Sequence, residues 1–302
     1  MKDIVYVEHQ YYVSVRGNSF RFANLVTKEE HFVPLDEIEW LIFNNEKSYF
    51  TKRLVTVCME KGIGILFCDL KHNPGCLLST SYGHSQRVTR LRTQLALQKK
   101  TKNRLWRKIV IAKINNQADC LAEALHKEDA TKKIRSIGKT VVEGDPHNRE
   151  AYAARIYFIN LFGAGFRRGR FDDAVNASLN YGYALVRALI RRELALHGLE
   201  ASLGIKHESV ENPFNLSDDI IEAYRPFVDA MVYEKIYDKK IISLELEEKK
   251  QLLQVFMEKC VIDNKVFTIN DAVSVTVESY IKCIEENSAA PLKLPMFIEG
   301  GK

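Results

Sequence analysis

Residues 79–85, STSYGHS, separate two parts of the chain that have different hydrophobic patterns. Before this polar segment, short runs rich in β-branched and aromatic residues, such as IVYV, YYVSVRG and SFRFAN, predict β-strands. After it, from Gln86 onward, leucine and isoleucine recur at intervals of three and four residues among strong helix formers, which predicts helices. The sequence therefore predicts an α+β fold, with a small N-terminal β-rich domain followed by a larger all-α domain.

The same patterns set the expected domain boundaries. We expect the β-rich domain over residues 1–78, a linker over 79–86 and the helical domain over 87–288. Residues 289–302 hold two prolines and a glycine pair, and we expect this segment to be a flexible tail.

Turn formers predict the shorter features. Arg16-Gly17-Asn18 predicts a tight hairpin between two strands, and a short helix is expected over residues 51–61. In the helical part, GDPHN at residues 144–148 precedes a helix that begins at Arg149, residues 204–216 are irregular, and CVIDNKVFTI at 260–269 is a candidate hairpin.

Composition excludes several classes of protein. The chain has 302 residues, of which 46% are hydrophobic, so it can bury a large core and is not globally disordered. No run approaches the ~20 apolar residues of a membrane helix, which predicts a cytoplasmic protein that does not bind membranes. The six cysteines are scattered without a Cys-x-x-Cys pair, which favours reduced, buried thiols over disulfides or a zinc site.

Positive charge is concentrated in one part of the sequence. Between Asp69 and Asp119 there are eleven lysines and arginines and no acidic residue, and further basic clusters lie at 167–170 and 191–192. Clustered cations neutralise nucleic-acid phosphates, whereas ordinary solvated helices usually interleave acids for pairing. The distribution favours a nucleic-acid-binding surface over the alternative of solvated helix faces.

Acidic and histidine side chains at irregular positions are candidates for a metal site. They are Glu150 at the start of a helix, His207 past a helix end, and Asp218, Asp219 and Glu222 in a short helical segment. Carboxylates with an imidazole are suitable ligands for a divalent cation in phosphodiester chemistry. Asp219 and Glu222 are three residues apart, so we expect both on one face of their helix.

Each candidate also has a structural interpretation. Glu150 could form an ion pair with Arg149 or Arg155, and a lone histidine is often only structural. Asp218 could support a helix N-terminus that Ser217 caps. The residues alone leave these alternatives open.

Four collinear blocks resemble a known family. They are GDPHNREAYAARIYFINLFG (144–163), NASLNYGYALVRALI (176–190), LGIKHES (203–209) and FNLSDDIIEAYRPFVD (214–229). In order and spacing these blocks are similar to the CRISPR-associated endonuclease that acts as the integrase of spacer acquisition. The SYGHSQRVTRLRTQL segment and the overall length look most like the versions from type II systems.

The resemblance implies a set of site residues. Glu150, His207 and Glu222 would be the catalytic ligands of Mg²⁺ or Mn²⁺, with Asp219 as an auxiliary ligand. Some members of the family carry an aspartate as the last ligand, where this chain has Glu222. The residues expected to contact DNA are Tyr82, His84, Arg87, Arg90, Arg92, Arg104, Arg149, Arg155, Arg167, Arg168 and Arg170.

The resemblance also implies a reaction and partners. The family joins short DNA fragments to a CRISPR repeat, through attack of a fragment 3′-hydroxyl on a phosphodiester. Its members form homodimers through their β domains, and two dimers assemble with a small ferredoxin-like second CRISPR-associated protein into a heterohexamer. Other adaptation proteins and the effector nuclease are further possible partners. The competing hypotheses are a non-catalytic DNA-binding scaffold and a structure-selective nuclease for branched DNA.

Overall fold

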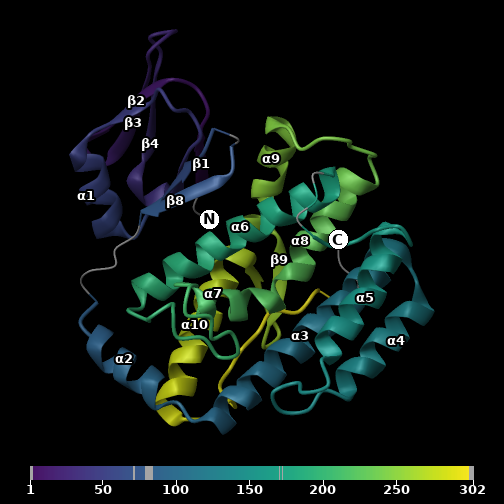
Figure 1. The fold of residues 1–302 in the computed structure, drawn as a ribbon. Coiled ribbons are helices and arrows are strands. Elements are labelled where there is room, and N and C mark those ends of the chain that lie inside the picture. Colours follow the sequence, from purple (N-terminus) through teal and green to yellow (C-terminus); the bar gives the residue numbers. More distant parts are fainter. Residues whose placement is uncertain (1–2, 71, 79–83, 170, 172, 299–302) are drawn as a thin grey trace. The chain divides into compact units, whose positions relative to one another are not determined.

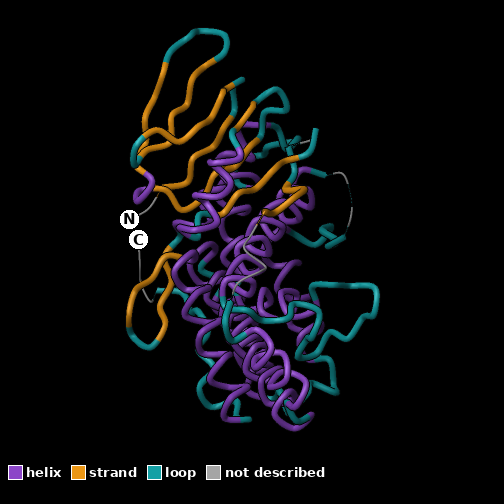
Figure 2. The backbone as a smooth tube through the Cα atoms, turned by 90° about the vertical axis from the view of Figure 1, so that its left-hand side faces the viewer, coloured by secondary structure: helices purple, strands orange, loops and turns teal. Residues whose placement is uncertain are grey.

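The computed structural model describes residues 3–70, 72–78, 84–169, 171 and 173–298. Contacts divide the chain into two compact units, Met1–His84 and Ser85–Lys302. Figures 1 and 2 show strands concentrated in the first unit and helices in the second, so the predicted α+β class is confirmed.

The N-terminal unit is built mainly from strands. Its described residues form two four-stranded sheets, with the strand orders β4-β3-β2-β6 and β1-β5-β7-β8. The strands are β1 (Asp3–Val7), β2 (Tyr11–Arg16), β3 (Ser19–Asn24), β4 (Glu30–Pro34), β5 (Ile38–Phe43), β6 (Tyr49–Phe50), β7 (Gly64–Cys68) and β8 (Pro74–Leu78). Helix α1 spans Lys52–Lys61, and buried residues from both sheets and from this helix form one core.

Local sequence signals explain these elements. Gly17, with φ of +60°, forms the turn between β2 and β3, whose ends pair Arg16 with Ser19. Thr51 caps α1, because its side-chain oxygen accepts a hydrogen bond from the backbone N–H of Leu54 at 3.2 Å. The predicted hairpin and the predicted helix are both confirmed.

The C-terminal unit is mainly helical. Its α-helices are α2 (Arg87–Ala96), α3 (Lys99–Leu125), α4 (Glu128–Lys139), α5 (Arg149–Phe162), α6 (Ala174–Leu196), α7 (Asn215–Ile220), α8 (Arg225–Val232), α9 (Leu246–Leu252) and α10 (Ile269–Glu286). Shorter turns are the 3₁₀ segments η2 (Ile221–Ala223) and η4 (Leu253–Met257) and the π-helical turn η3 (Tyr233–Tyr237). Strands β9 (Lys259–Ile262) and β10 (Lys265–Thr268) form the expected hairpin.

Helix α3 is central to the packing of this unit. It contacts α4, α5, α8 and η2, and Figure 1 shows α3, α4 and α5 side by side. Helix α6 packs against α8, and their approach is close at Gly182, where an added Cβ would lie 2.4 Å from Cγ1 of Val228. Through these contacts α3, α5 and the α7–η2 segment meet around one region.

The structure corrects the expected flexible tail. In its described part, residues 289–298, Leu292 is buried, and Phe297 stacks on Phe227 with ring centroids 4.3 Å apart. Met296 exchanges backbone hydrogen bonds of 2.8 and 2.9 Å with Val261. Prolines and glycines indicate irregular backbone, but the apolar side chains between them still pack on the helices.

Asp229 is a buried carboxyl group in the core between α6 and α8. Tyr183 donates a hydrogen bond from its hydroxyl to Oδ1 of Asp229, and among the described residues no partner is found for the buried Oδ2. Burial is the main cause that raises the pKa of Asp229 from 3.8 to about 6.

We predict that Asp229 makes the protein less stable as the pH rises from about 4 to above 6. In this range the folded state binds more protons than the unfolded state. The pKa of Asp229 is about 6 in the folded state and 3.8 in the unfolded state, which corresponds to about 3 kcal/mol in the free energy of unfolding. In Asp229→Asn this contribution disappears, so the difference in unfolding free energy between wild type and variant should change by most of that amount between pH 4 and pH 7. Denaturant unfolding at both pH values measures it, with the exposed Asp238→Asn as the control. An unchanged difference would contradict the raised pKa.

Candidate functional site

Glu150 lies in the first turn of α5 and is positioned by the turn that precedes the helix. The buried Asp145 accepts hydrogen bonds from the backbone N–H groups of Arg149 (2.9 Å) and Glu150 (3.0 Å). Asp145 and Asn148 both have positive φ angles, of 46° and 50°, which short polar side chains tolerate. The GDPHN segment therefore caps α5 and fixes the backbone that carries Glu150.

A buried lysine joins Glu150 to Glu222. Nζ of Lys113, on α3, lies 2.5 Å from Oε1 of Glu150 and also forms an ion pair with Oε2 of Glu222, on η2. The ion pair seen for Glu150 is thus with a residue 37 positions away, and not with the neighbouring arginines that the sequence suggests. Two carboxylates from distant parts of the chain converge on one cation.

The charges of this cluster depend on one another. Burial alone would raise the pKa of Glu222, but Arg225 and Lys113 hold it below its usual value. Nε of Arg225 donates to Oε1 of Glu222 at 2.8 Å. Burial would lower the pKa of Lys113, but the two glutamates raise it above its usual value. Glu222 and Lys113 are therefore both charged at neutral pH.

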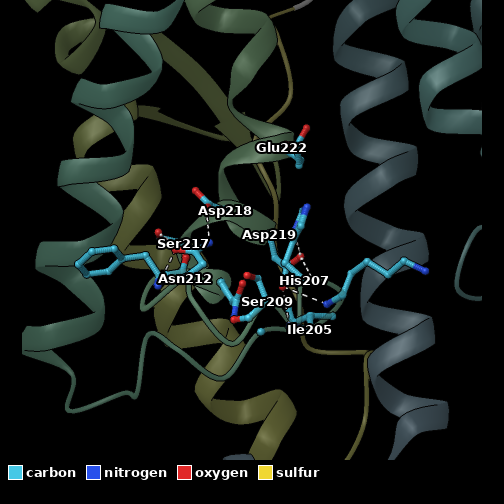
Figure 3. A network of polar contacts seen from close by, with 12 residues as sticks. Ile205, His207, Ser209, Asn212, Ser217, Asp218, Asp219 and Glu222 are labelled. Atoms are coloured by element: carbon cyan, nitrogen blue, oxygen red, sulfur yellow. Dashed lines mark hydrogen bonds and ion pairs between the residues drawn. The ribbon is translucent and has the colours of Figure 1, made fainter.

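His207 is held in one orientation by Asp219, as Figure 3 shows. Nδ1 of His207 lies 2.8 Å from Oδ1 of Asp219. Because a carboxylate can only accept, Nδ1 carries the proton, and the neutral imidazole has its lone pair on Nε2. The hydrogen bond to Asp219 is also the main cause that raises the pKa of His207. The His207 ring packs nearly perpendicular to the ring of the buried Trp106, with centroids 5.9 Å apart.

Asp219 also organises the backbone before His207. Its Oδ2 accepts from the N–H groups of Ile205 (2.5 Å) and Lys206 (3.0 Å), and its Oδ1 accepts from the N–H of His207 at 3.2 Å. Asp219 is completely buried, and each of its oxygens accepts two hydrogen bonds. This geometry favours a role in positioning His207 over the auxiliary ligand role that the sequence suggests.

The helical segment that carries these acids differs from the expectation in detail. Ser217 lies inside α7 and donates from its hydroxyl to the carbonyl of Phe214, so the prediction that it caps the helix is wrong. Asp219 bonds to the His207 loop, and Glu222 lies apart from these bonds (Figure 3). Glu222 follows in η2 and bonds to Lys113 and Arg225 instead. The segment changes from α-helix to 3₁₀-helix after Ile220, between Asp219 and Glu222, and the two acids bond to different partners.

Gly204 is required where the His207 loop folds back on itself. A Cβ atom there would lie 2.1 Å from the carbonyl oxygen of His207 and 2.9 Å from Oδ2 of Asp219. We predict that Gly204→Ala displaces the loop and weakens any activity that needs His207 by about 10- to 100-fold. The measurement is a comparison of strand joining with that of Gly165→Ala, a glycine around which an added Cβ meets nothing within 4 Å. Equal activity of the two variants would contradict this role.

The arginines predicted to contact DNA lie in different environments. Arg87, Arg92, Arg104, Arg155 and Arg167 are exposed, with Arg104 paired to Glu143 at 2.7 Å. Four further residues of the predicted DNA-contacting set are half-buried, namely one histidine and three arginines: His84, Arg90, Arg149 and Arg168.

Two of the half-buried arginines make contacts inside the protein. Arg90 donates to the carbonyl of His197, and Arg168 bonds to Asn176 (3.1 Å) and Asn180 (2.7 Å). Tyr82 and Arg170 lie outside the described residues. Whether any of this set contacts DNA stays a prediction.

Sequence reasoning missed the cations inside the cluster. Lys113 was one of eleven cations in the basic window, yet it lies on the buried face of α3 with Trp106, Ile109 and Val110. Its spacing of seven, four and three residues from these apolar positions is the signal that could have found it. A lysine within an apolar stripe must find buried partners, and here they are the two glutamates.

The carboxylates of Glu150 and Glu222 and the imidazole of His207 are chemically suitable ligands for a divalent cation. Among the described residues, no group of three or more His, Cys, Asp or Glu side chains stands ready to hold a metal ion. Even so, Glu150 and Glu222 already meet at one cation, and hydrogen bonding at Nδ1 of His207 leaves Nε2 as a ligand atom. A cavity of about 620 Å³ beside His207, lined among others by Lys102, Ser209 and Asn212, gives access from solvent.

Comparison with known proteins identifies the family. Residues 4–264 match the family model described as CRISPR associated protein Cas1. The chain belongs to the Cas1 family. It is 37% identical over 270 residues to the CRISPR-associated endonuclease Cas1 of Neisseria meningitidis, a match that covers 88% of each chain. The resemblance that the sequence suggests is therefore confirmed.

Solved structures show the same Cas1 fold at lower identity. A casposase bound to its integration product has a TM-score of 0.73 and 17% identity, with 95% of this chain and 92% of the casposase chain covered. A chain of a Cas6-RT-Cas1–Cas2 complex has a TM-score of 0.70 and 15% identity, covering 99% of this chain and 36% of the other. Among the helices of the described residues, none is long and apolar enough to cross a membrane.

Proposed function

We propose that this Cas1 protein joins the 3′-hydroxyl ends of short DNA fragments to a CRISPR repeat, in a reaction that depends on Mg²⁺ or Mn²⁺. The single observation that carries the proposal is the convergence of Glu150 and Glu222 on one cation, in a chain whose relatives are named CRISPR-associated endonucleases. His207, fixed by Asp219 beside an open cavity, supplies the third ligand.

Each protein group has a defined task in this proposal. A bound Mg²⁺ or Mn²⁺ would supply Lewis-acid activation of the 3′-hydroxyl and compensate charge on the phosphate. Glu150, Glu222 and Nε2 of His207 would hold that ion, and Asp219 keeps the imidazole in the tautomer that exposes Nε2. Arg225 holds the carboxylate of Glu222 in place. The exposed arginines on α2, α3 and α5 bind phosphates of the DNA strands.

The reaction is a transesterification that needs no covalent link to the protein. The 3′-oxygen of the fragment forms a new bond to a phosphorus of the repeat and loses its proton. The bond from that phosphorus to the 3′-oxygen of the repeat breaks, and this oxygen takes up a proton. The number of phosphodiester bonds is conserved, so no external energy source is required.

We further propose the assembly in which the reaction occurs. The N-terminal β-rich unit would form a homodimer, and a small second CRISPR-associated protein would join two such dimers in a heterohexamer. The presence of a chain of similar fold in a Cas1–Cas2 complex supports this partner. We propose a cytoplasmic location, where the repeat DNA lies.

A plasmid-joining assay tests the proposed function. Short duplexes are mixed with a supercoiled repeat-containing plasmid, the second CRISPR-associated protein and Mn²⁺ or Mg²⁺. We expect joined product with free 3′-hydroxyl ends, and none with 3′-blocked ends or with EDTA. Joined product that forms equally well in EDTA would contradict the proposal.

A DNA-binding scaffold is the second candidate, because the ion pairs of Lys113 and Arg225 also account for both glutamates as structural groups. The scaffold predicts tight DNA binding with no joined product under any metal condition. A parallel reaction on branched DNA distinguishes a junction nuclease, which would cleave the junction faster than it joins fragments.

A further inference from the structure

Lys113 occupies the position at which the two proposed carboxylate ligands meet. Its side chain is only 10% exposed, and its ammonium bonds to Glu150 on one side and to Glu222 on the other. Lys113 reaches this point from α3, whereas Glu150 comes from α5 and Glu222 from η2. The lysine therefore links three separate elements of the C-terminal unit.

A divalent ion and this ammonium compete for the same oxygens. Oε2 of Glu222 bonds to Lys113, and Oε1 accepts the hydrogen bond of 2.8 Å from Arg225. Both oxygens of Glu222 are thus already bonded to cationic donors. A metal ion between Glu150 and Glu222 would lie within a few ångströms of Nζ, where two positive charges repel strongly in a buried setting.

We propose that Lys113 is an internal counter-ion of the metal centre, which keeps Glu150 and Glu222 together without metal and is displaced when metal binds. This inference rests on the proposed function, because it takes the two glutamates as metal ligands. The flexible four-carbon stem of lysine lets the ammonium move without any change in α3. Lys113 therefore sets how tightly the centre holds its metal. When no metal is bound, its positive charge offsets the repulsion between the carboxylates of Glu150 and Glu222.

The test measures metal binding and stability without any DNA. Full-length wild type, Lys113→Met and Lys113→Gln are titrated with Mn²⁺, and free Mn²⁺ is followed by its electron paramagnetic resonance signal. Thermal unfolding is recorded in EDTA and in saturating Mn²⁺. The matched control is Lys133→Met, which removes an exposed lysine from α4.

We expect both Lys113 variants to bind Mn²⁺ about tenfold more tightly than wild type, because a nearby positive charge is gone. In EDTA they should unfold roughly 5 °C or more below wild type, because two acids lose a buried partner. Saturating Mn²⁺ should recover most of this difference. The Gln variant keeps a hydrogen-bonding group and covers the case in which the Met variant does not fold.

Two results would overturn the inference in different ways. If the Lys113 variants bind Mn²⁺ as wild type does, or more weakly, then Lys113 supports the ligands and does not compete with the ion. If the Glu150→Gln and Glu222→Gln variants bind Mn²⁺ as tightly as wild type does, the assignment of the metal centre is wrong, and the proposed function fails with it.

Discussion

His207→Ala should reduce strand joining by at least about 10³-fold, while the fold and the affinity for DNA stay close to those of wild type. The imidazole of His207 is the one nitrogen ligand of the proposed centre. Asp219 bonds to Nδ1 of this ring, which leaves Nε2 as the ligand atom. The side chain is 48% exposed, so its removal costs little packing. The plasmid-joining assay measures the rate, and fluorescence anisotropy with a labelled duplex measures the affinity.

His147→Ala is the matched control for this prediction. His147 is exposed in the turn before α5 and lies outside the proposed centre. Its removal should leave the joining rate within about twofold of wild type, as for most surface substitutions. If His207→Ala joins DNA as fast as His147→Ala, then His207 has no part in the chemistry.

Asp219→Ala should have the second largest effect, and this effect combines stability with function. The substitution leaves the buried N–H group of Ile205 and the partly buried N–H groups of Lys206 and His207 without their acceptor. Each unsatisfied buried group costs about 1–3 kcal/mol, so we expect the free energy of unfolding to fall by roughly 3–5 kcal/mol. Denaturant unfolding of the full-length protein measures this loss.

Asp219→Asn separates positioning from stability. Asparagine fills the same space and keeps one acceptor oxygen, so we expect a smaller loss of stability. It no longer presents a carboxylate to Nδ1 of His207, and Mn²⁺ affinity should still fall about 10- to 100-fold.

The neighbouring Asp218→Asn is the control, since Asp218 pairs with Arg187 at 3.5 Å and accepts its hydrogen bond from Asn212 and not from His207. If Asp219→Asn retains wild-type Mn²⁺ affinity, Asp219 acts only through folding.

Local signals made much of the fold predictable. The Arg16-Gly17-Asn18 turn, the short helix over residues 51–61 and the GDPHN break before α5 each depend on residues close in sequence, and the structure shows all three features. Glu150, His207 and Glu222 were candidates because of their residue types and their positions in the predicted elements. All three were assigned as ligands from the resemblance to a family, and these roles stay predictions.

The contacts that assemble the site could not be read from the sequence. Lys113 and Glu222 are 109 residues apart, and only the packing of α3 against η2 brings them together. The role of Asp219 depends on a loop 12 to 14 residues earlier that folds back over it. The packed segment at residues 289–298 was missed for a related reason, because its apolar residues find partners on distant helices.

The most direct test of the account is the location of bound Mn²⁺, by anomalous X-ray scattering from crystals of the wild-type protein grown with that ion. The account predicts an anomalous peak in contact with carboxylate oxygens of Glu150 and Glu222 and with Nε2 of His207, with the ammonium of Lys113 moved away. A peak that contacts none of these three side chains, or an unchanged Lys113 bridge at saturating Mn²⁺, would contradict it.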